Sequence, residues 1–339
     1  MADHPVLDII EGTEETHRGL GNLAAMTVLC IKARKCMVTV SPPGCGKSTI
    51  TNWIQEKHPD AYIKDSITRS SLTTYSDQFN GFTGCMLFDD VGKIDTPWSR
   101  VQTLVTMAEL IHGHFVSKDA YQIKIDIDDF HGSAVLNIQP SVLAEVMEHP
   151  TWHSNLADKS IRYYHLVRAT MPTRDGLDVP IDWGLDMTEV EPYNGAPELW
   201  HELLEIGLEQ WTRPRAIEHC QDLLAAVAAI GRSPAPGDQE ATILLDLMRP
   251  LTVELEVMQM HGFGSKAVLD VNLLYLLTEF ATYRNVTYET IAVDMHMRPR
   301  QVAAILGNMI DWYEKIGTNP IKLQPTARLT QLLEKAGLR

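Results

Sequence analysis

Cysteine is scarce in this sequence and follows no pattern. The five cysteines form no CxxC pair and no regular framework, and they are Cys30, Cys36, Cys45, Cys85 and Cys220. This excludes a disulfide scaffold and places the chain in a reducing compartment, the cytoplasm.

Histidine is also poorly arranged for metal binding. The pairs His112–His114 and His149–His153 have no cysteine or carboxylate cluster beside them.

Long hydrophobic runs are absent as well. The most apolar early run, Leu23 to Ile31, is too short to cross a bilayer, and the N-terminus lacks the layout of a signal peptide. There is no internal repeat. With 339 residues and an ordinary hydrophobic content, the sequence predicts two or three domains and no contact with a membrane.

Basic residues are outnumbered by acidic ones. The net charge of -15 excludes a uniformly basic surface for nucleic acid, so any such contact must be local. Residues 263–339 differ from the rest, because they carry nine Lys and Arg against seven Asp and Glu.

The stretch from Met37 to Ile50 has the order strand, loop, helix. A β-branched run leads into a loop with two glycines, and apolar residues then recur at helical spacing. In such a loop, backbone N–H groups face a phosphate, a lysine reaches the β- and γ-phosphates, and a hydroxyl holds Mg²⁺. The pattern predicts binding of a nucleoside triphosphate with Mg²⁺, although Ser41 replaces the first glycine of GxxxxGK[ST]. The alternative is a Gly/Pro turn with an accidental Lys-Ser-Thr. The expected binding residues are Pro43, Gly44, Cys45, Gly46, Lys47, Ser48 and Thr49.

Two further apolar runs end in polar side chains. Residues 85–88 are typical of a buried parallel strand, and they end in Asp89 and Asp90. Asp89 is expected to orient the water shell of Mg²⁺, and Asp90 to orient or deprotonate the attacking water. The alternative is an acidic turn. Residues 133–136 end in Asn137, which either holds the attacking water or the γ-phosphate, or only closes an Asx turn.

A third strand-like run, residues 161–167, begins near Arg162. The SPPGCGKST loop, the strand ending FDD, the strand ending LN and this arginine together resemble the AAA+ ATPases over residues 15–170. The resemblance implies that Asn137 is the first sensor and that Arg162 is an arginine finger for ATP bound by a neighbouring subunit, with Arg168 as a competing candidate.

A finger supplied by a neighbour implies a homo-oligomer, hexameric or ring-like. The resemblance also implies that Lys47 contacts phosphate, that Ser48 and Asp89 hold Mg²⁺, and that Asp90 is the second member of the acidic pair. Most of the family has Asp-Glu where this chain has Asp-Asp.

Residues 171–197 are predicted to be a connector, followed by two amphipathic helices. Between these helices, residues 212–216 resemble the second-sensor segment of the AAA+ helical lid, especially that of the branch-migration motor and its origin-recognition relatives. The resemblance implies that Arg215 touches the γ-phosphate from the lid. The alternative is a solvated arginine at the start of a helix.

The C-terminal sequence has helix-turn-helix spacing over residues 270–310, followed by a predicted β-wing and a final helix. Arg298, Arg300 and Gln301 lie in the first exposed turn of the expected recognition helix, where DNA contacts would be made. A winged helix of this type follows the lid in the same branches of AAA+. The alternative is that this unit binds a protein partner, because four acidic residues reduce the positive charge around the basic residues. They are Glu289, Asp294, Asp311 and Glu314.

The sequence therefore predicts an α/β fold with a P-loop AAA+ core of parallel sheet and flanking helices, then an all-α lid and a winged helix. The expected domains are residues 1–175, 176–261 and 262–339, and residues 1–12 are expected to be extended. The expected function is an oligomeric ATPase that acts on DNA as a motor, loader or switched platform. The rivals are a regulatory ATPase whose winged helix binds protein, and a nucleotide-locked structural subunit.

Overall fold

In the computed structural model, the described residues are 4–68, 70–114, 116–120, 123–152, 156–170, 176–260, 267–318 and 321–339. The expected domain boundaries at 175 and 261 fall outside these ranges, as do His153 and part of the expected wing tip.

A five-stranded parallel sheet of order β2-β3-β6-β1-β7 lies at the centre of the fold. Its strands are β1 (Cys36–Val40), β2 (Ala61–Ile63), β3 (Cys85–Phe88), β6 (Ser133–Ile138) and β7 (Ile161–Tyr164). All except β2 are buried along their whole length. Helices cover both faces of the sheet, which explains why these strands are continuous apolar runs in the sequence.

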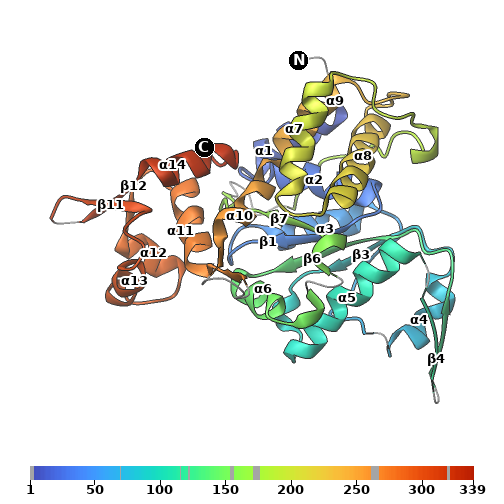
Figure 1. Cartoon of the computed structure of the whole chain (residues 1–339), viewed down its shortest axis with the longest axis horizontal. Coiled ribbons are helices and arrows are strands. Elements are labelled where there is room, and N and C mark those ends of the chain that lie inside the picture. Colours follow the sequence, from blue (N-terminus) through green and yellow to red (C-terminus); the bar gives the residue numbers. More distant parts are fainter. Residues whose placement is uncertain are drawn as a thin grey trace.

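Helices lie on both faces of the sheet (Figure 1). One face carries α1 (Pro5–Thr16), α2 (Gly21–Lys32) and α3 (Lys47–Lys57), and the other carries α4 (Leu72–Phe79), α5 (Pro97–Gly113) and α6 (Pro140–Met147). A hairpin of β4 (Val116–Ala120) and β5 (Ile123–Ile127) follows α5.

The expected extended lead-in is wrong, because residues 5–16 are helical. His4 caps this helix by accepting a hydrogen bond from the Val6 amide at 3.2 Å, Pro5 occupies its first turn, and Val6 and Ile9 are buried.

A helical bundle packs beside α1 and α2 (Figure 1). It comprises α7 (Pro197–Leu208), α8 (Arg213–Ile230) and α9 (Asp238–Met248). The chain then passes through α10 (Val253–Val257) and a hairpin of β8 (Met258–Met260) and β9 (Ala267–Leu269).

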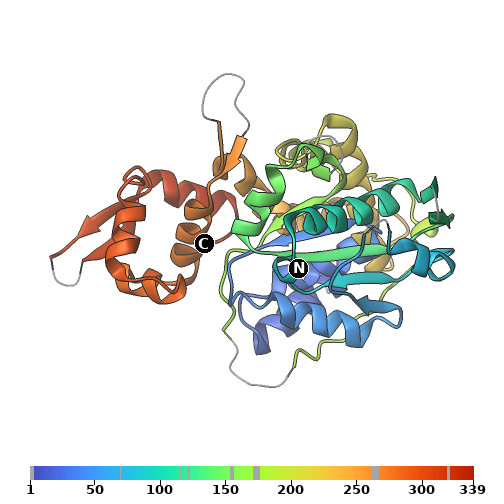
Figure 2. The ribbon, with the colours of Figure 1, turned by 90° about the horizontal axis from the view of Figure 1, so that it is seen from below.

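Residues 270–318 and 321–339 form the C-terminal unit, which lies at one end of the molecule (Figures 1 and 2). Its helices are α11 (Val271–Thr282), α12 (Tyr288–Asp294), α13 (Pro299–Leu306) and α14 (Ala327–Lys335). Its sheet has the order β10-β12-β11, with β10 (Val286–Thr287), β11 (Tyr313–Ile316) and β12 (Lys322–Pro325). Two helices joined by a short turn, a hairpin and a closing helix therefore follow one another as the sequence indicates.

Most buried apolar side chains of the described residues belong to two large clusters. One joins the α5 face of the sheet to the C-terminal unit, and the other joins α1, α2 and α3 to the helical bundle. Each of the outer units therefore shares a core with the sheet layer, and hydrophobic burial holds all three together.

Candidate functional site

The loop between β1 and α3, residues 41–46, is called the phosphate loop here after its sequence pattern. Its backbone is suited to an anion. Gly44 and Gly46 both adopt φ of 80°, and Gly46 is the N-cap of α3 without any side-chain cap. The Thr49 amide already donates to the Gly46 carbonyl at 3.1 Å, and the amides of Lys47 and Ser48 before it lie at the positive end of the helix, where a ligand would accept from them. A Cβ at Gly46 would approach the Leu20 side chain to 2.7 Å, so packing as well as backbone conformation requires glycine here.

Lys47 is folded back onto its own loop. Its Nζ donates to the Ser41 carbonyl at 2.7 Å, to Ser41 Oγ at 2.8 Å and to the Pro42 carbonyl at 3.1 Å. Burial deprives the ammonium ion of the water that would normally solvate it, and this lowers the pKa of Lys47. Ser41 is not in the left-handed region, which explains why glycine is dispensable there, and its hydroxyl gives the lysine an additional partner.

Asp89 lies at the carboxyl end of β3 against the start of α3. It accepts a hydrogen bond from Thr51 at 3.3 Å and pairs with Lys93 at 3.2 Å. Burial raises the pKa of Asp89, but hydrogen bonds from Ser48 and Lys93 outweigh this effect and lower the pKa below its usual value. The carboxylate is therefore ionised beside the Ser48 hydroxyl, and these two oxygen donors suit Mg²⁺.

Asp90 and Asn137 are held differently. Asp90 Oδ1 accepts from the Gly92 amide at 2.8 Å, and Oδ2 faces the Gln139 amide nitrogen at 3.5 Å. Asn137 pairs with Thr39 in the sheet register, is 2% exposed and has a side-chain nitrogen without a hydrogen-bond partner. A buried amide donor without a partner is costly, and it fits a ligand or water that completes the site.

A cavity of about 350 Å³ joins these groups. It is lined by Pro43, Gly44, Cys45, Gly46, Lys47, Ser48, Thr49, Asp89, Asp90, Lys93 and Gln139. All seven expected loop residues and both expected carboxylates thus meet at one site, with Asn137 buried nearby in β6. Lys93, Gln139 and Thr51 were not predicted. Gln139 was detectable in principle, because it follows the β6 strand end two residues after Asn137.

The interpretation of Arg162 as a finger for a neighbouring subunit is wrong in this structure. Its side chain is 1% exposed, and Nε pairs with Glu254 at 2.6 Å. The guanidinium also donates to the carbonyls of Ser160 and Gln210 at 3.2 and 2.9 Å. The ion pair between Arg162 and Glu254 therefore links β7 of the sheet to α10, the helix that leads to the C-terminal unit.

The second-sensor interpretation of Arg215 is also wrong in this structure. Its guanidinium contacts His112 and Glu218, and Glu218 pairs with Lys35 at 3.6 Å. Lys35 precedes β1, whereas the phosphate loop follows β1. Arg215 therefore lies at the opposite edge of the sheet from the phosphate loop.

The chain after β7 supports the phosphate loop from outside. His165 Nε2 lies 2.9 Å from the Cys45 carbonyl, and burial lowers the pKa of His165 to about 4, so it donates as a neutral ring. Arg168 Nη1 donates to the Pro43 carbonyl at 2.9 Å. Both residues follow a strand that is adjacent to β1, a pairing that the sequence alone does not reveal.

The predicted DNA-contacting side chains all lie on the surface of the C-terminal unit. Arg298, Arg300 and Gln301 are exposed at the start of α13. The Gln301 side chain accepts a hydrogen bond from the Arg298 amide at 3.0 Å, so it helps to begin the helix.

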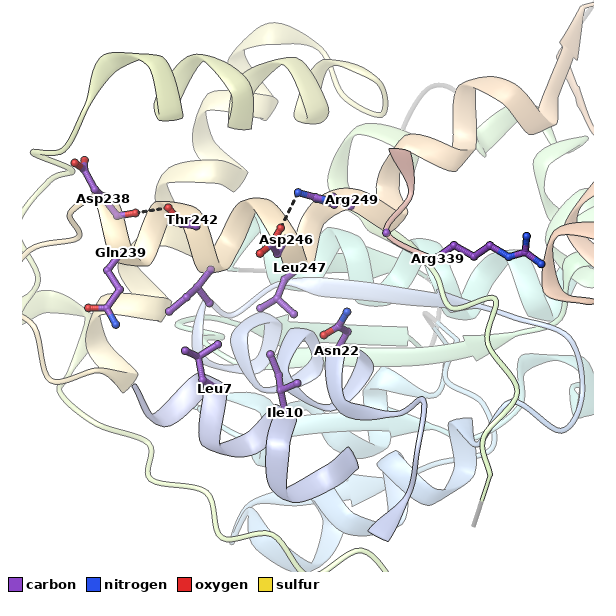
Figure 3. A pocket seen from close by; sticks show the side chains of 12 residues that line it. Leu7, Ile10, Asn22, Asp238, Gln239, Thr242, Asp246, Leu247, Arg249 and Arg339 are labelled. Carbon is purple, nitrogen blue, oxygen red and sulfur yellow. Dashed lines mark hydrogen bonds and ion pairs between the residues drawn. The ribbon is translucent and has the colours of Figure 1, made fainter. Parts of the chain in front are cut away.

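A larger cavity of about 630 Å³ lies away from the phosphate loop, between α1, α9 and the C-terminus (Figure 3). Leu7, Ile10 and Leu247 give it an apolar floor, while Asp246 and Arg249 pair with each other at 3.0 Å. We assign no chemistry to this cavity. No helix in the described parts of the chain has the length and apolar character needed to span a bilayer.

Comparison of this chain with models of known protein families and with curated protein sequences finds no match.

Proposed function

We propose that this protein is an ATPase of the AAA+ type that couples ATP binding and hydrolysis to action on DNA. The observation that carries the proposal is the meeting of the phosphate loop, Asp89 and Asp90 in one cavity at the carboxyl edge of a parallel sheet, with Asn137 buried beside it in β6. Ligands of open α/β sheets bind at this edge.

The chemistry follows from these residues. Lys47 would exchange its loop carbonyls for the β- and γ-phosphates, while the loop amides and the start of α3 bind the remaining oxygens. Mg²⁺, held by Ser48 and Asp89, would neutralise the phosphate oxygens. Asp90 would orient or deprotonate the attacking water, with its carboxylate fixed by the Gly92 amide and Gln139. The free amide nitrogen of Asn137 would donate to that water or to the γ-phosphate.

The remaining units fit secondary roles in the proposal. The bundle of α7, α8 and α9 is proposed as the lid, and the C-terminal unit as a winged helix that binds DNA through Arg298, Arg300 and Gln301. We retain assembly into a homo-oligomer in the proposal because of the resemblance to AAA+ ATPases. Arg162 adds no support for assembly, because it pairs with Glu254 inside its own chain.

The test is steady-state phosphate release, with and without duplex and single-stranded DNA, at several protein concentrations. The proposal predicts turnover that DNA stimulates, that rises more than linearly with protein and that disappears in Lys47→Ala. Turnover should persist in Lys57→Ala, a control at the far end of the same helix. ATP binding without any turnover would instead favour a nucleotide-locked structural subunit.

A second candidate is a regulatory ATPase whose C-terminal unit binds a protein. It is favoured by apolar side chains exposed on that unit, because Val293 is 72% and Ile310 is 67% exposed. Salt-dependent duplex binding that is lost in Arg298→Ala/Arg300→Ala would favour DNA, and its absence would favour protein.

A further inference from the structure

Arg168 touches two parts of the molecule that are far apart in the sequence. One nitrogen of its guanidinium, Nη1, donates to the Pro43 carbonyl of the phosphate loop at 2.9 Å. The same nitrogen would lie 3.4 Å from a Cβ built on Gly44, so it lies directly beside the loop glycine. The side chain is only 12% exposed.

The other nitrogens of this guanidinium face the C-terminal unit. Nη2 donates to Glu279 of α11 at 2.9 Å, and Nε pairs with Asp294 of α12 at 3.0 Å. The Arg168 amide also donates to the Thr282 hydroxyl at 3.0 Å. The Asp294 contact is an ion pair rather than a hydrogen bond, and a guanidinium suits such a bridge because its charge is delocalised over three nitrogens.

The two acids lie in the same largely buried region as the arginine. The Glu279 side chain is 0% exposed and that of Asp294 is 17% exposed. Among the described residues, Tyr275 and Tyr283 are the other titratable groups of this unit that face the bridge. Arg168 is therefore the cation that pairs with both acids, and the acids in turn fix where it meets the loop.

We propose that Arg168 is a positioning residue that couples the shape of the phosphate loop to the docking of the C-terminal unit through Glu279 and Asp294. The inference rests on the proposed function, because the loop's ligand is taken to be ATP. Since coupling between two sites is reciprocal, nucleotide binding and docking then stabilise each other. Nucleotide binding would thereby affect the docking of the unit whose surface carries Arg298 and Arg300.

The test uses the full chain, with a fluorescent ATP analogue and Mg²⁺ as the probe. Arg168→Ala and Asp294→Ala should both weaken binding, by about 5- to 150-fold, although Asp294 does not line the phosphate cavity. The double variant should bind no more weakly than Arg168→Ala, because both changes break the same link. Arg284→Ala, an exposed arginine of the same unit, should bind like the wild type.

Hydrogen exchange without nucleotide gives an independent readout. In Asp294→Ala, the amides of residues 44–48 should exchange faster than in the wild type, while those of α8 should not change. Wild-type affinity in Asp294→Ala, additive losses in the double variant, or unchanged exchange of the loop would each overturn the coupling. If the wild type binds no ATP, the proposed function fails, and the exchange experiment still decides whether the bridge holds the loop.

Discussion

Replacing Arg162 tests whether this residue is a structural anchor or a finger. Arg162→Ala would leave the Glu254 carboxylate, 10% exposed, without its cation, and the carbonyls of Ser160 and Gln210 without their donor. Breaking a buried ion pair from one side costs about 3–5 kcal/mol. At about 2–4 °C per kcal/mol for a large domain, we expect the melting temperature to fall by ~6 °C or more.

The assay is thermal unfolding of the wild type, Arg162→Ala, and Arg213→Ala as an exposed arginine control. A further variant, Arg162→Met/Glu254→Gln, removes both charges, keeps an acceptor for Tyr164, and should recover much of the loss. A wild-type melting temperature in Arg162→Ala, combined with loss of turnover, would refute the anchor and restore the finger.

Three other outcomes are expected. Asp90→Asn should slow phosphate release at saturating ATP by about 100-fold or more and leave ATP affinity nearly unchanged. Burial, together with the neighbouring Asp294, raises the pKa of the Glu279 carboxyl, so the stability that its protonated form contributes at low pH is lost as the pH rises through neutrality. The melting temperature of Glu279→Gln minus that of the wild type should therefore increase from pH 5 to pH 8. A difference that does not change with pH would contradict this. Arg298→Ala and Arg300→Ala should each reduce the salt slope of duplex binding by about 1.

The positions of the glycine-rich loop and of the strand-end carboxylates were predictable because the patterns that specify them are local. Glycine, lysine and hydroxyl spacing specifies a loop between β1 and α3, and apolar runs ending in Asp89 or Asn137 identify buried parallel strands. Parallel strands in one sheet then bring their carboxyl ends to one edge without further information.

The roles of the arginines were not predictable in the same way. Arg162 and Arg215 were assigned by position along the chain, but their partners, Glu254 and His112, are about 100 residues away in sequence. Whether an arginine faces a ligand or a buried acid depends on how the bundle and the C-terminal unit pack, which no local pattern records. The same reason hides the bridge from Arg168 to the C-terminal unit.

Calorimetric titration of the full chain with ATP in the presence of Mg²⁺ tests the central claim most directly. We predict one site per chain in the wild type and in Lys57→Ala, and no detectable binding in a folded Lys47→Ala variant. Absence of binding in the wild type, or equal binding in Lys47→Ala, would contradict the claim that this loop is a nucleotide site.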